Sequence, residues 1–380
     1  MSGGHRGDGA EGRRAGLVRG ERQREYDPPA AGPIGRALAT WRVRRGLSQR
    51  ALSERAGLET SWVSAVETGR EWVDRRRPLA ALASALRLDV GELTGQPYSP
   101  LNAAHADLRA VAHRVRRALA ADQPGPDNAT GPRRELEEFV TLAEAAEAAG
   151  DEHGLALVVP TLIEDQAADL HSRGHAMAAG LLRRLGYRDL AWLLLHRAAR
   201  AGGAETGAVR AEEVRLLLEL GLPEDALVRA KQAEEAPLPL LKAFAHAMAG
   251  RPGRAASLLD AVAERARNGD EHAMVAAARV AVAVEAGDFG AAADCATAAE
   301  PQRLTPAART ALLVRLAATA ARTGRTDEAA GHLEQAEATA PLRFLLDPFA
   351  RELLAALPAR ITDTEIAGRL RETAQRAGIP

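Results

Sequence analysis

The stretch GLSQRALSERAGL at residues 46–58, followed by SWVSAVETG at 61–69, decides the fold of the N-terminal part of this chain. Ser48 can cap a short helix that begins at Gln49, and Gly57 supplies the left-handed backbone that a tight turn needs. Ser53 offers a small side chain where a second helix, after the turn, has to cross the first. The pattern therefore predicts two short helices held at a fixed angle, the second free to enter a groove.

Helical signals continue on both sides of this pair. Residues 34–45 place Ile34, Leu38 and Trp41 at helical spacing, Pro78 begins a fourth helix, and a short fifth helix covers residues 90–93. We expect one five-helix domain over residues 33–98. Residues 1–32 are rich in glycine and charge and are expected to form a disordered arm.

At this point the sequence resembles a known family. Residues 34–94 are similar to the lambda-repressor/Cro-type (XRE family) helix-turn-helix domain, which implies binding of double-stranded DNA. The resemblance implies that Gln49 contacts a DNA phosphate and that Arg70 lies near the DNA backbone. It also implies that Arg42 and Glu67 form a structural ion pair. It also assigns groove-facing positions to Thr60, Ser61, Ser64 and Ala65.

Two features depart from the family pattern. Glu59 stands where Ser or Thr usually caps the third helix, and no groove-facing position carries Arg, Asn or Gln for paired contacts to a base. Selectivity would then depend on phosphate placement, DNA shape or the basic loop at Arg75–Arg77, of which Arg75 is our candidate contact. Trp62 either packs against Trp41 or Trp72, or lies against sugar and a thymine methyl group.

The chain beyond the N-terminal domain contains a repeat. Glycines recur at near-regular intervals, at Gly150, Gly186, Gly221, Gly250, Gly287 and Gly324. An alanine stands five residues after each of the last five, at Ala191, Ala226, Ala255, Ala292 and Ala329. Such a pattern predicts helix pairs that reverse at the glycine and touch through small residues. Residues 172–341 resemble tetratricopeptide (TPR) repeats, whose period is about 34 residues.

The flanking segments complete this interpretation. Residues 99–132 are expected to be a linker helix and a mobile loop, and residues 133–380 a TPR-like repeat domain with capping helices. Pro160 is expected to interrupt a helix in the N-terminal cap, and residues 342–378 are expected to add two closing helices. The fold class is all-α: a small five-helix DNA-binding domain followed by a TPR-like α-solenoid.

Arrays of this kind curve, and the first helix of each pair lines the concave face. This places a candidate ligand groove on two sets of residues: basic positions Arg173, Arg183, Arg184 and Arg215, and apolar positions Phe244, Met248 and Met274. Such a groove suits an extended peptide with an acidic group. The alternative interpretation is ordinary surface arginines and ordinary core residues.

Composition excludes several classes of protein. A single cysteine, Cys295, rules out a disulfide framework. No apolar run is long enough to span a bilayer, and no secretory signal opens the chain, so we expect a cytoplasmic protein. His171 and His175 are one helical turn apart, but Gly174 is expected to break that helix. We therefore expect no metal site there. Because the sequence shows no glycine-rich phosphate loop and no Ser/His/Asp arrangement that can be singled out, we also expect no cofactor and no enzymatic activity.

Formal net charge is −1, but residues 33–100 carry 11 basic and 7 acidic residues, and residues 101–380 carry 33 and 39. A small basic domain that is expected to bind DNA is thus joined to a larger, acidic repeat domain. The sequence indicates a bacterial transcriptional regulator that binds a palindromic operator as a homodimer, with a possible peptide or small-molecule effector. The alternatives are a TPR-type interaction scaffold with secondary DNA binding, or a phage- or antitoxin-type repressor.

Overall fold

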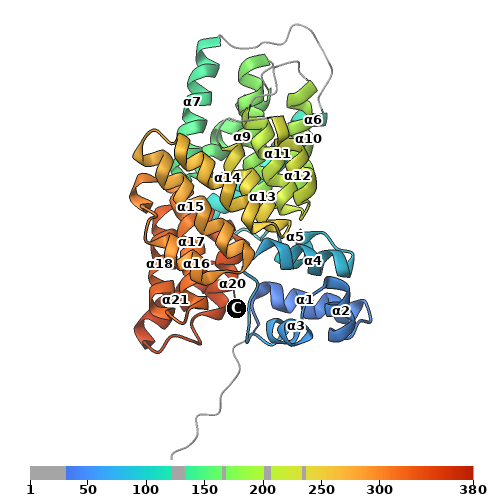
Figure 1. Cartoon of the computed structure of the whole chain (residues 1–380). Coiled ribbons are helices and arrows are strands. Elements are labelled where there is room, and N and C mark those ends of the chain that lie inside the picture. The colour runs from blue at the N-terminus through green and yellow to red at the C-terminus, as the bar shows by residue number, and fades with distance from the viewer. Residues whose placement is uncertain (1–30, 121–132, 165–167, 201–206, 233–236, 380) are drawn as a thin grey trace, which may run out of the picture.

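The computed structural model describes residues 31–120, 133–164, 168–200, 207–232 and 237–379, which form helices joined by short turns and contain no β-strand. Most of the predicted N-terminal arm and the predicted loop at 122–132 lie outside these residues. The all-α prediction is confirmed, with a small N-terminal bundle followed by helical repeats (Figure 1).

The N-terminal domain contains the five predicted helices. They are α1 (Pro33–Arg44), α2 (Gln49–Ala56), α3 (Thr60–Glu67), α4 (Arg76–Leu86) and α5 (Val90–Thr94). Its core takes apolar side chains from every helix, among them Leu38, Leu52, Val63, Leu82 and Leu93, each 0% exposed. These positions recur at helical spacing because each helix turns one face inward.

The repeat domain contains the remaining described helices. They are α6 (Ala103–Ala120), α7 (Arg133–Ala149), α8 (Glu152–Glu164), α9 (Ala168–Leu185), α10 (Arg188–Arg200), α11 (Gly207–Glu219), α12 (Pro223–Arg229), α13 (Leu238–Met248), α14 (Pro252–Arg265), α15 (Gly269–Ala286), α16 (Phe289–Ala296), α17 (Pro306–Arg322), α18 (Thr326–Thr339), α19 (Pro341–Leu346), α20 (Pro348–Ala356) and α21 (Thr364–Arg376). Short 3₁₀ turns cover Ala230–Gln232 and Pro301–Arg303.

Helices α7 to α18 form six consecutive hairpins, and each hairpin turns at one of the six predicted glycines. All six have a positive φ, between +69° and +91°, which a side-chain residue adopts only at a cost. The alanines five residues after the last five glycines are 0–1% exposed, so their small side chains lie where paired helices touch. The predicted helix-pair pattern is confirmed at these positions.

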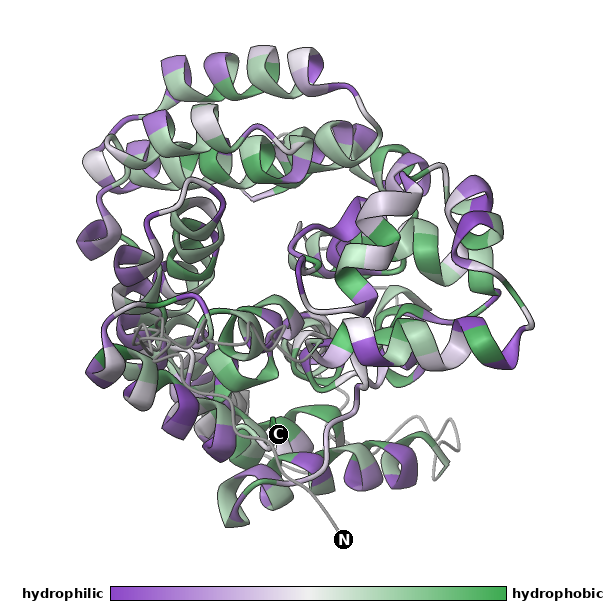
Figure 2. Cartoon of the chain, turned by 90° about the horizontal axis from the view of Figure 1, so that it is seen from below, coloured by the Kyte–Doolittle hydropathy of each residue, from purple (hydrophilic) through white to green (hydrophobic). Residues whose placement is uncertain are grey.

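The row of hairpins curves until its two ends meet. The first helices of successive pairs pack side by side from α7 through α17, and α17 then contacts α7, while α19 contacts α8 and α9. Figure 2 shows the helices running round an arc and not in a straight stack. The first hairpin is thus in contact with the last.

Charged side chains hold this closure. Arg343 of α19 pairs with Glu147 of α7 at 2.9 Å and with Glu152 of α8 at 2.6 Å, and Arg184 of α9 reaches the same two acids. Burial favours the neutral acid, but Arg184 and Arg343 outweigh it and lower the pKa of Glu147 to about 2. Glu147 therefore stays charged over the whole range in which proteins are normally studied.

Two expected helix breaks are wrong. Helix α8 runs through Pro160, because its buried neighbours Leu155, Val159 and Leu162 anchor the helix on both sides of the lost hydrogen bond. Helix α9 runs through Gly174, where a Cβ atom would come within 2.9 Å of Leu162 Cβ. Gly174 thus permits close packing of α8 and α9.

The terminal parts of the repeat domain also differ from expectation. Helix α6 is not a separate linker: Leu108, Val111 and Val115 are buried in the core that α8, α9 and α10 share. The C-terminal segment contains three helices, α19 to α21, where two were expected, because Pro348 begins a new helix directly after Asp347. Among the described helices, none is long and apolar enough to cross a membrane.

Candidate nucleic-acid interface and its junction with the repeats

Helices α2 and α3 meet through a short turn with the local features that the sequence predicts. Ser48 Oγ accepts the N–H of Ala51 at 3.1 Å and caps α2, and Gly57 takes a φ of +64°. Ser53 is 1% exposed, and its Oγ lies 2.6 Å from Thr60 Oγ1 at the start of α3. The turn and this hydroxyl pair fix the angle between the two helices.

A polar cluster supports α3 from behind. Arg42 of α1 donates to both carboxylate oxygens of Glu67, at 2.6 and 2.8 Å, and to the carbonyl of Leu47 at 2.9 Å. Gln49 Nε2 donates to Glu67 Oε2 at 2.7 Å. The hydrogen bonds to Glu67 raise the pKa of Arg42. Three helices are tied together at one carboxylate, which is 4% exposed.

The outer face of α3 carries the residues to which the resemblance gave groove-facing roles. Thr60 and Ser61 are exposed, and Ser64 and Ala65 are half-buried. Glu59 precedes the helix without capping it, and its carboxylate accepts a long hydrogen bond from Ser61 Oγ at 3.4 Å. In Figure 1, α2 and α3 lie at the lower end of the molecule, with α4 and α5 between them and the hairpins α11–α14.

Three other residues were expected to contact DNA, and only some of them face the same way as α3. Arg70 is exposed just after α3, with Nε 3.1 Å from Thr68 Oγ1. Trp62 is half-buried and packs against the N-terminal core, as Trp41 does. Arg75, in contrast, is directed toward the repeats, with its guanidinium 5.9 Å from the ring centre of Phe289. The structure therefore places Gln49 and Ser61 on the α2–α3 pair and Arg70 just after it. The Arg75 guanidinium lies against Phe289 of the repeats, although Arg75 also lines a hollow with Glu59 and Trp62.

The hairpin turns of the repeat domain form a seam with the N-terminal domain. At four consecutive turns, a Cβ atom placed on the glycine would crowd a residue of the segment 75–97, and the hairpins meet this segment in reverse chain order. The contacts are Gly186 with Gln96, Gly221 with Ala80, Gly250 with Arg77, and Gly287 with Arg75. The glycines thus allow close approach between domains as well as a left-handed turn.

Two helices of the N-terminal domain take their caps from the repeats. Helix α4 has no capping side chain of its own, and Glu285 of α15 accepts the N–H of Arg76 at 3.0 Å and that of Arg77 at 2.7 Å. Helix α1 also lacks one, and Glu352 of α20 accepts the N–H of Ile34. Burial raises the pKa of both carboxyls, that of Glu352 to about 7.

Trp72 joins the N-terminal domain to the last helices of the repeat domain. Its ring is 5% exposed and lies between two guanidinium groups, that of Arg322 at 4.1 Å and that of Arg360 at 4.4 Å from the ring centre. Arg322 also pairs with Glu71 and, at 2.6 Å, with Asp74. This ring belongs to the core of α17–α21, so the two domains share apolar packing as well as charge pairs.

The arginines of the candidate ligand groove form ion pairs with acidic residues of the same chain. Arg183 is 8% exposed and binds Glu212 at 3.0 Å and Glu219 at 2.5 Å. Arg184 is held in the closing ion pairs, Arg215 pairs with Glu212, and Arg173 pairs with Glu144. Acids of the chain itself therefore neutralise the basic end. Among the apolar members, Met248 is buried, Phe244 is partly buried in a core, and Met274 is 38% exposed.

Sequence reasoning missed the residues of the seam. Glu285, Glu352, Arg322 and Arg360 are distant in the chain from the helices they hold, and no local pattern marks them. One signal was available: α1 follows Gly32 and α4 follows Arg75, and neither residue has a side chain that accepts a hydrogen bond from the first N–H groups of the helix. A missing cap indicates that the exposed N–H groups find a partner elsewhere.

Comparisons with known proteins add one domain assignment. The family described as "Helix-turn-helix domain" matches residues 33–94. The crystal structure of Bacillus thuringiensis PlcR in complex with the peptide PapR7 and DNA aligns with 82% of this chain and 95% of that chain, at 12% identity and a TM-score of 0.28. No curated protein matches. From the family match and the α2–turn–α3 geometry, we identify residues 33–94 as a helix-turn-helix domain.

Proposed function

We propose that this chain is a non-catalytic, sequence-specific DNA-binding transcriptional regulator, in which α3 enters the major groove. The observation that carries the proposal is the arrangement around α3. Its inner side is held by the Arg42–Glu67–Gln49 cluster, while Thr60 and Ser61 on its outer side are exposed. A recognition helix needs this combination of a rigid support and a free outer face.

The charge distribution supports the same proposal. Residues 33–100 have a formal charge of +4, from 11 basic and 7 acidic side chains, while residues 101–380 have −6. Arg55 of α2 and Arg70 after α3 are exposed, and so is Arg50 of α2, which forms a surface ion pair with Glu54. All three can approach phosphate. Short hydroxyl side chains on α3 would read the base edges over few hydrogen bonds, which leaves a large share of affinity to these arginines.

The repeat domain completes the proposal. We expect a bacterial cytoplasmic regulator that binds a palindromic operator as a homodimer, because one small domain makes few base contacts and a two-fold pair doubles them. The seam supports a modulating role for the repeats, since capping, charge pairs and apolar packing all join them to the DNA-binding domain. An effector acts on DNA affinity only if it prefers one arrangement of that seam.

Selection of bound fragments from a random DNA pool, followed by footprinting of the winner over a salt series, tests this function. The proposal predicts one enriched motif with two-fold symmetry and an affinity that falls steeply with salt. Arg70→Ala should reduce the salt slope, whereas Arg254→Ala, an exposed arginine on α14, should leave it unchanged. Absence of an enriched motif would contradict the assignment.

A further inference from the structure

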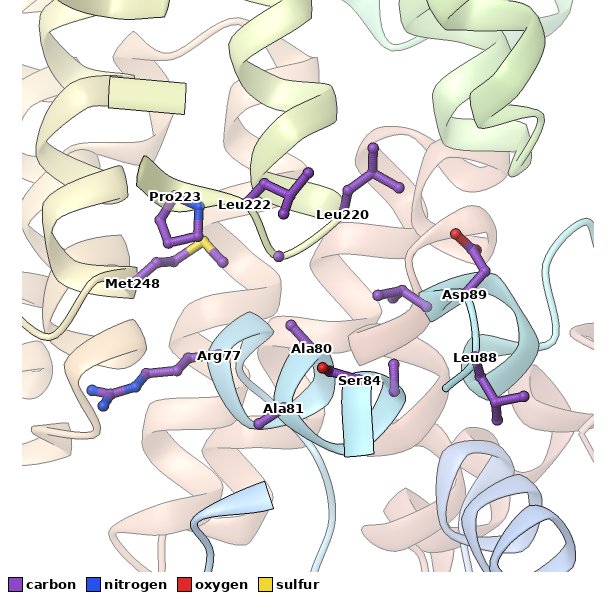
Figure 3. Close-up of a pocket in the computed structure, with 13 residues that line it drawn as sticks. Arg77, Ala80, Ala81, Ser84, Leu88, Asp89, Leu220, Leu222, Pro223 and Met248 are labelled. Atoms are coloured by element: carbon purple, nitrogen blue, oxygen red, sulfur yellow. The ribbon is translucent and has the colours of Figure 1, made fainter. Parts of the chain in front are cut away.

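We propose that the cavity between the helix-turn-helix domain and the repeats binds a small amphipathic anion: an apolar body that carries one carboxylate or sulfonate. The cavity has a volume of about 480 Å³ and lies between α4 and the turn that joins α11 to α12 (Figure 3). Its volume is in the range of small-molecule sites, which also favour domain boundaries. Any regulatory effect of such a ligand rests on the proposed function, but the binding itself does not.

Most of the residues that line the cavity are apolar. Ala80 and Ala81 line the side formed by α4, and Leu222, Pro223 and Met248 line the side formed by the repeats. Small residues on α4 leave the space open. Leu222 is 42% exposed although it is a large apolar side chain, and Met248 is flexible enough to adapt to an occupant. An apolar body that covers Leu222 would remove this surface from water.

The sign of the ligand charge follows from the two ends of the cavity. At one end, Asp89 Oδ1 already accepts the N–H of Gly91 at 2.7 Å and lies 3.8 Å from Arg188. At the other end lies Arg77, an exposed residue whose guanidinium is bonded to no acid within the described part of the chain. Figure 3 shows Asp89 and Arg77 at opposite ends of the lining.

The neighbouring arginines make Arg77 distinctive. Arg75 lies 3.4 Å from Asp74, and Arg76 lies 3.5 Å from Glu219. Arg77 uses its backbone N–H for Glu285, which fixes its position, and its side chain remains available. Figure 3 shows the Arg77 guanidinium extending outward from the lining, at the outer edge of the cavity. A charged donor fork there matches a carboxylate or sulfonate at the outer end of a ligand.

Occupancy of this cavity would be coupled to the seam. At one edge the two walls are already in contact, because a methyl group on Gly221 would overlap Ala80 Cβ. A ligand that fits the present volume touches α4 and the α11–α12 turn at once, and therefore stabilises the docked arrangement over any separated one. Thermal stability of the full chain should rise with ligand concentration.

Two fluorescent probes test the site on the full-length chain. The first is 8-anilinonaphthalene-1-sulfonate, an apolar body with one sulfonate, and the second is the neutral N-phenyl-1-naphthylamine. Arg77→Gln should weaken the sulfonate probe by at least about tenfold, the worth of one charge-assisted hydrogen bond, and change the neutral probe by less than about twofold. Ala81→Phe, which fills the cavity, should weaken both probes.

Matched controls make the result decisive. Arg254→Gln removes an exposed arginine outside the cavity and should change neither probe. The proposal is overturned if neither probe binds wild type, if Arg77→Gln leaves the sulfonate probe unchanged or weakens both probes equally, or if Ala81→Phe weakens neither. Because no DNA is present, failure of the DNA-binding function would leave this titration unaffected. A separate measurement of DNA affinity, with and without saturating probe, then tests whether occupancy of the cavity changes DNA binding.

Discussion

Glu285 accepts the backbone N–H of Arg77 at 2.7 Å, although 208 residues separate them. The first turn of α4 therefore depends on a carboxylate of the repeat domain, and α1 depends in the same way on Glu352. The helix-turn-helix domain is therefore not structurally independent of the repeat domain. Its stability and orientation are set by the repeats, as the following predictions test.

Removal of the α4 cap should destabilise the N-terminal domain. Glu285→Ala leaves the partly buried N–H groups of Arg76 and Arg77 without this acceptor and should lower the free energy of unfolding by about 1–2 kcal/mol. Asp288→Ala is the matched control, because Asp288 caps its own helix, α16, by accepting the N–H of Ala291. Hydrogen exchange should show lost protection in α4 only for the first variant. Equal loss in α4 for both variants would contradict an inter-domain cap.

Gly221 and Gly324 separate the two roles of the turn glycines. Their φ values are similar, +76° and +79°, but an added methyl group overlaps Ala80 only at Gly221. Gly324→Ala should cost about 1–2 kcal/mol of unfolding free energy from backbone strain alone. Gly221→Ala should cost about 1–3 kcal/mol more through overpacking at the seam.

Urea unfolding of the two glycine variants measures this difference. In the double variant Gly221→Ala/Ala80→Gly, the loss should be smaller than the sum of the two single losses, because the overlapping methyl group is gone. Strict additivity would show that the two residues do not meet.

Arg42→Ala should destabilise the helix-turn-helix domain by about 2–4 kcal/mol, because it leaves Glu67 buried with only Gln49 as a side-chain partner. Arg44→Ala removes an exposed arginine of the same helix and should cost far less. Chemical denaturation of both variants gives the comparison. A midpoint for Arg42→Ala equal to that of wild type would mean that the cluster adds nothing to the support of α3.

Glu352 should make the seam sensitive to pH. Burial raises its pKa from an ordinary 4.5 to about 7, so the folded chain binds a proton that the unfolded chain releases between these values. Its contribution to stability therefore falls as pH rises through that window. The N–H groups of Ile34 and Val73 and the charge of Arg36 oppose the shift, and Asp74 adds to it.

Glu352→Gln keeps an acceptor for the N–H of Ile34 and cannot ionise. Its melting temperature should equal that of wild type near pH 4, below the unfolded pKa, and exceed it at pH 8. Glu92→Gln, at an exposed position on α5, should show no such divergence. A difference between Glu352→Gln and wild type that stays constant with pH would contradict the raised pKa.

Ala65→Arg should change which DNA sequences are selected, because it places a guanidinium with paired donors on the outer face of α3. Ala261→Arg adds the same charge at an exposed position of α14 and should raise non-specific affinity at most. If both variants select the wild-type motif, α3 does not enter the groove in the proposed orientation.

Local chemistry explains how much of this structure could be predicted. The six turn glycines, the cap at Ser48 and the turn at Gly57 each satisfy a requirement of their immediate neighbours, so the five-helix domain and the helix pairs follow from spacing alone. The helix-turn-helix match covers residues 33–94. These features depend on residues within a few positions of each other.

Contacts between distant segments could not be predicted in this way. Arg183 and Arg184 occupy regular positions on a first helix, and nothing nearby in the chain shows that Glu212, Glu219 and Glu147 neutralise them. Arg75 was expected near DNA because it stands in a basic loop, but its direction is set by Phe289 and Gly287. The curvature of the array decides these partners, and curvature accumulates from many small packing angles.

The closure of the hairpin row also limits how this protein can change in length. Open repeat arrays gain or lose units readily, since each unit contacts only its neighbours. Here Arg343 returns to Glu147 and Glu152, and four consecutive turns each meet a different residue between positions 75 and 97. Duplication of one hairpin would break the closure and displace every later turn from its partner. The number of repeats is therefore fixed by geometry, and this lineage is expected to vary by substitution within hairpins and not by their multiplication.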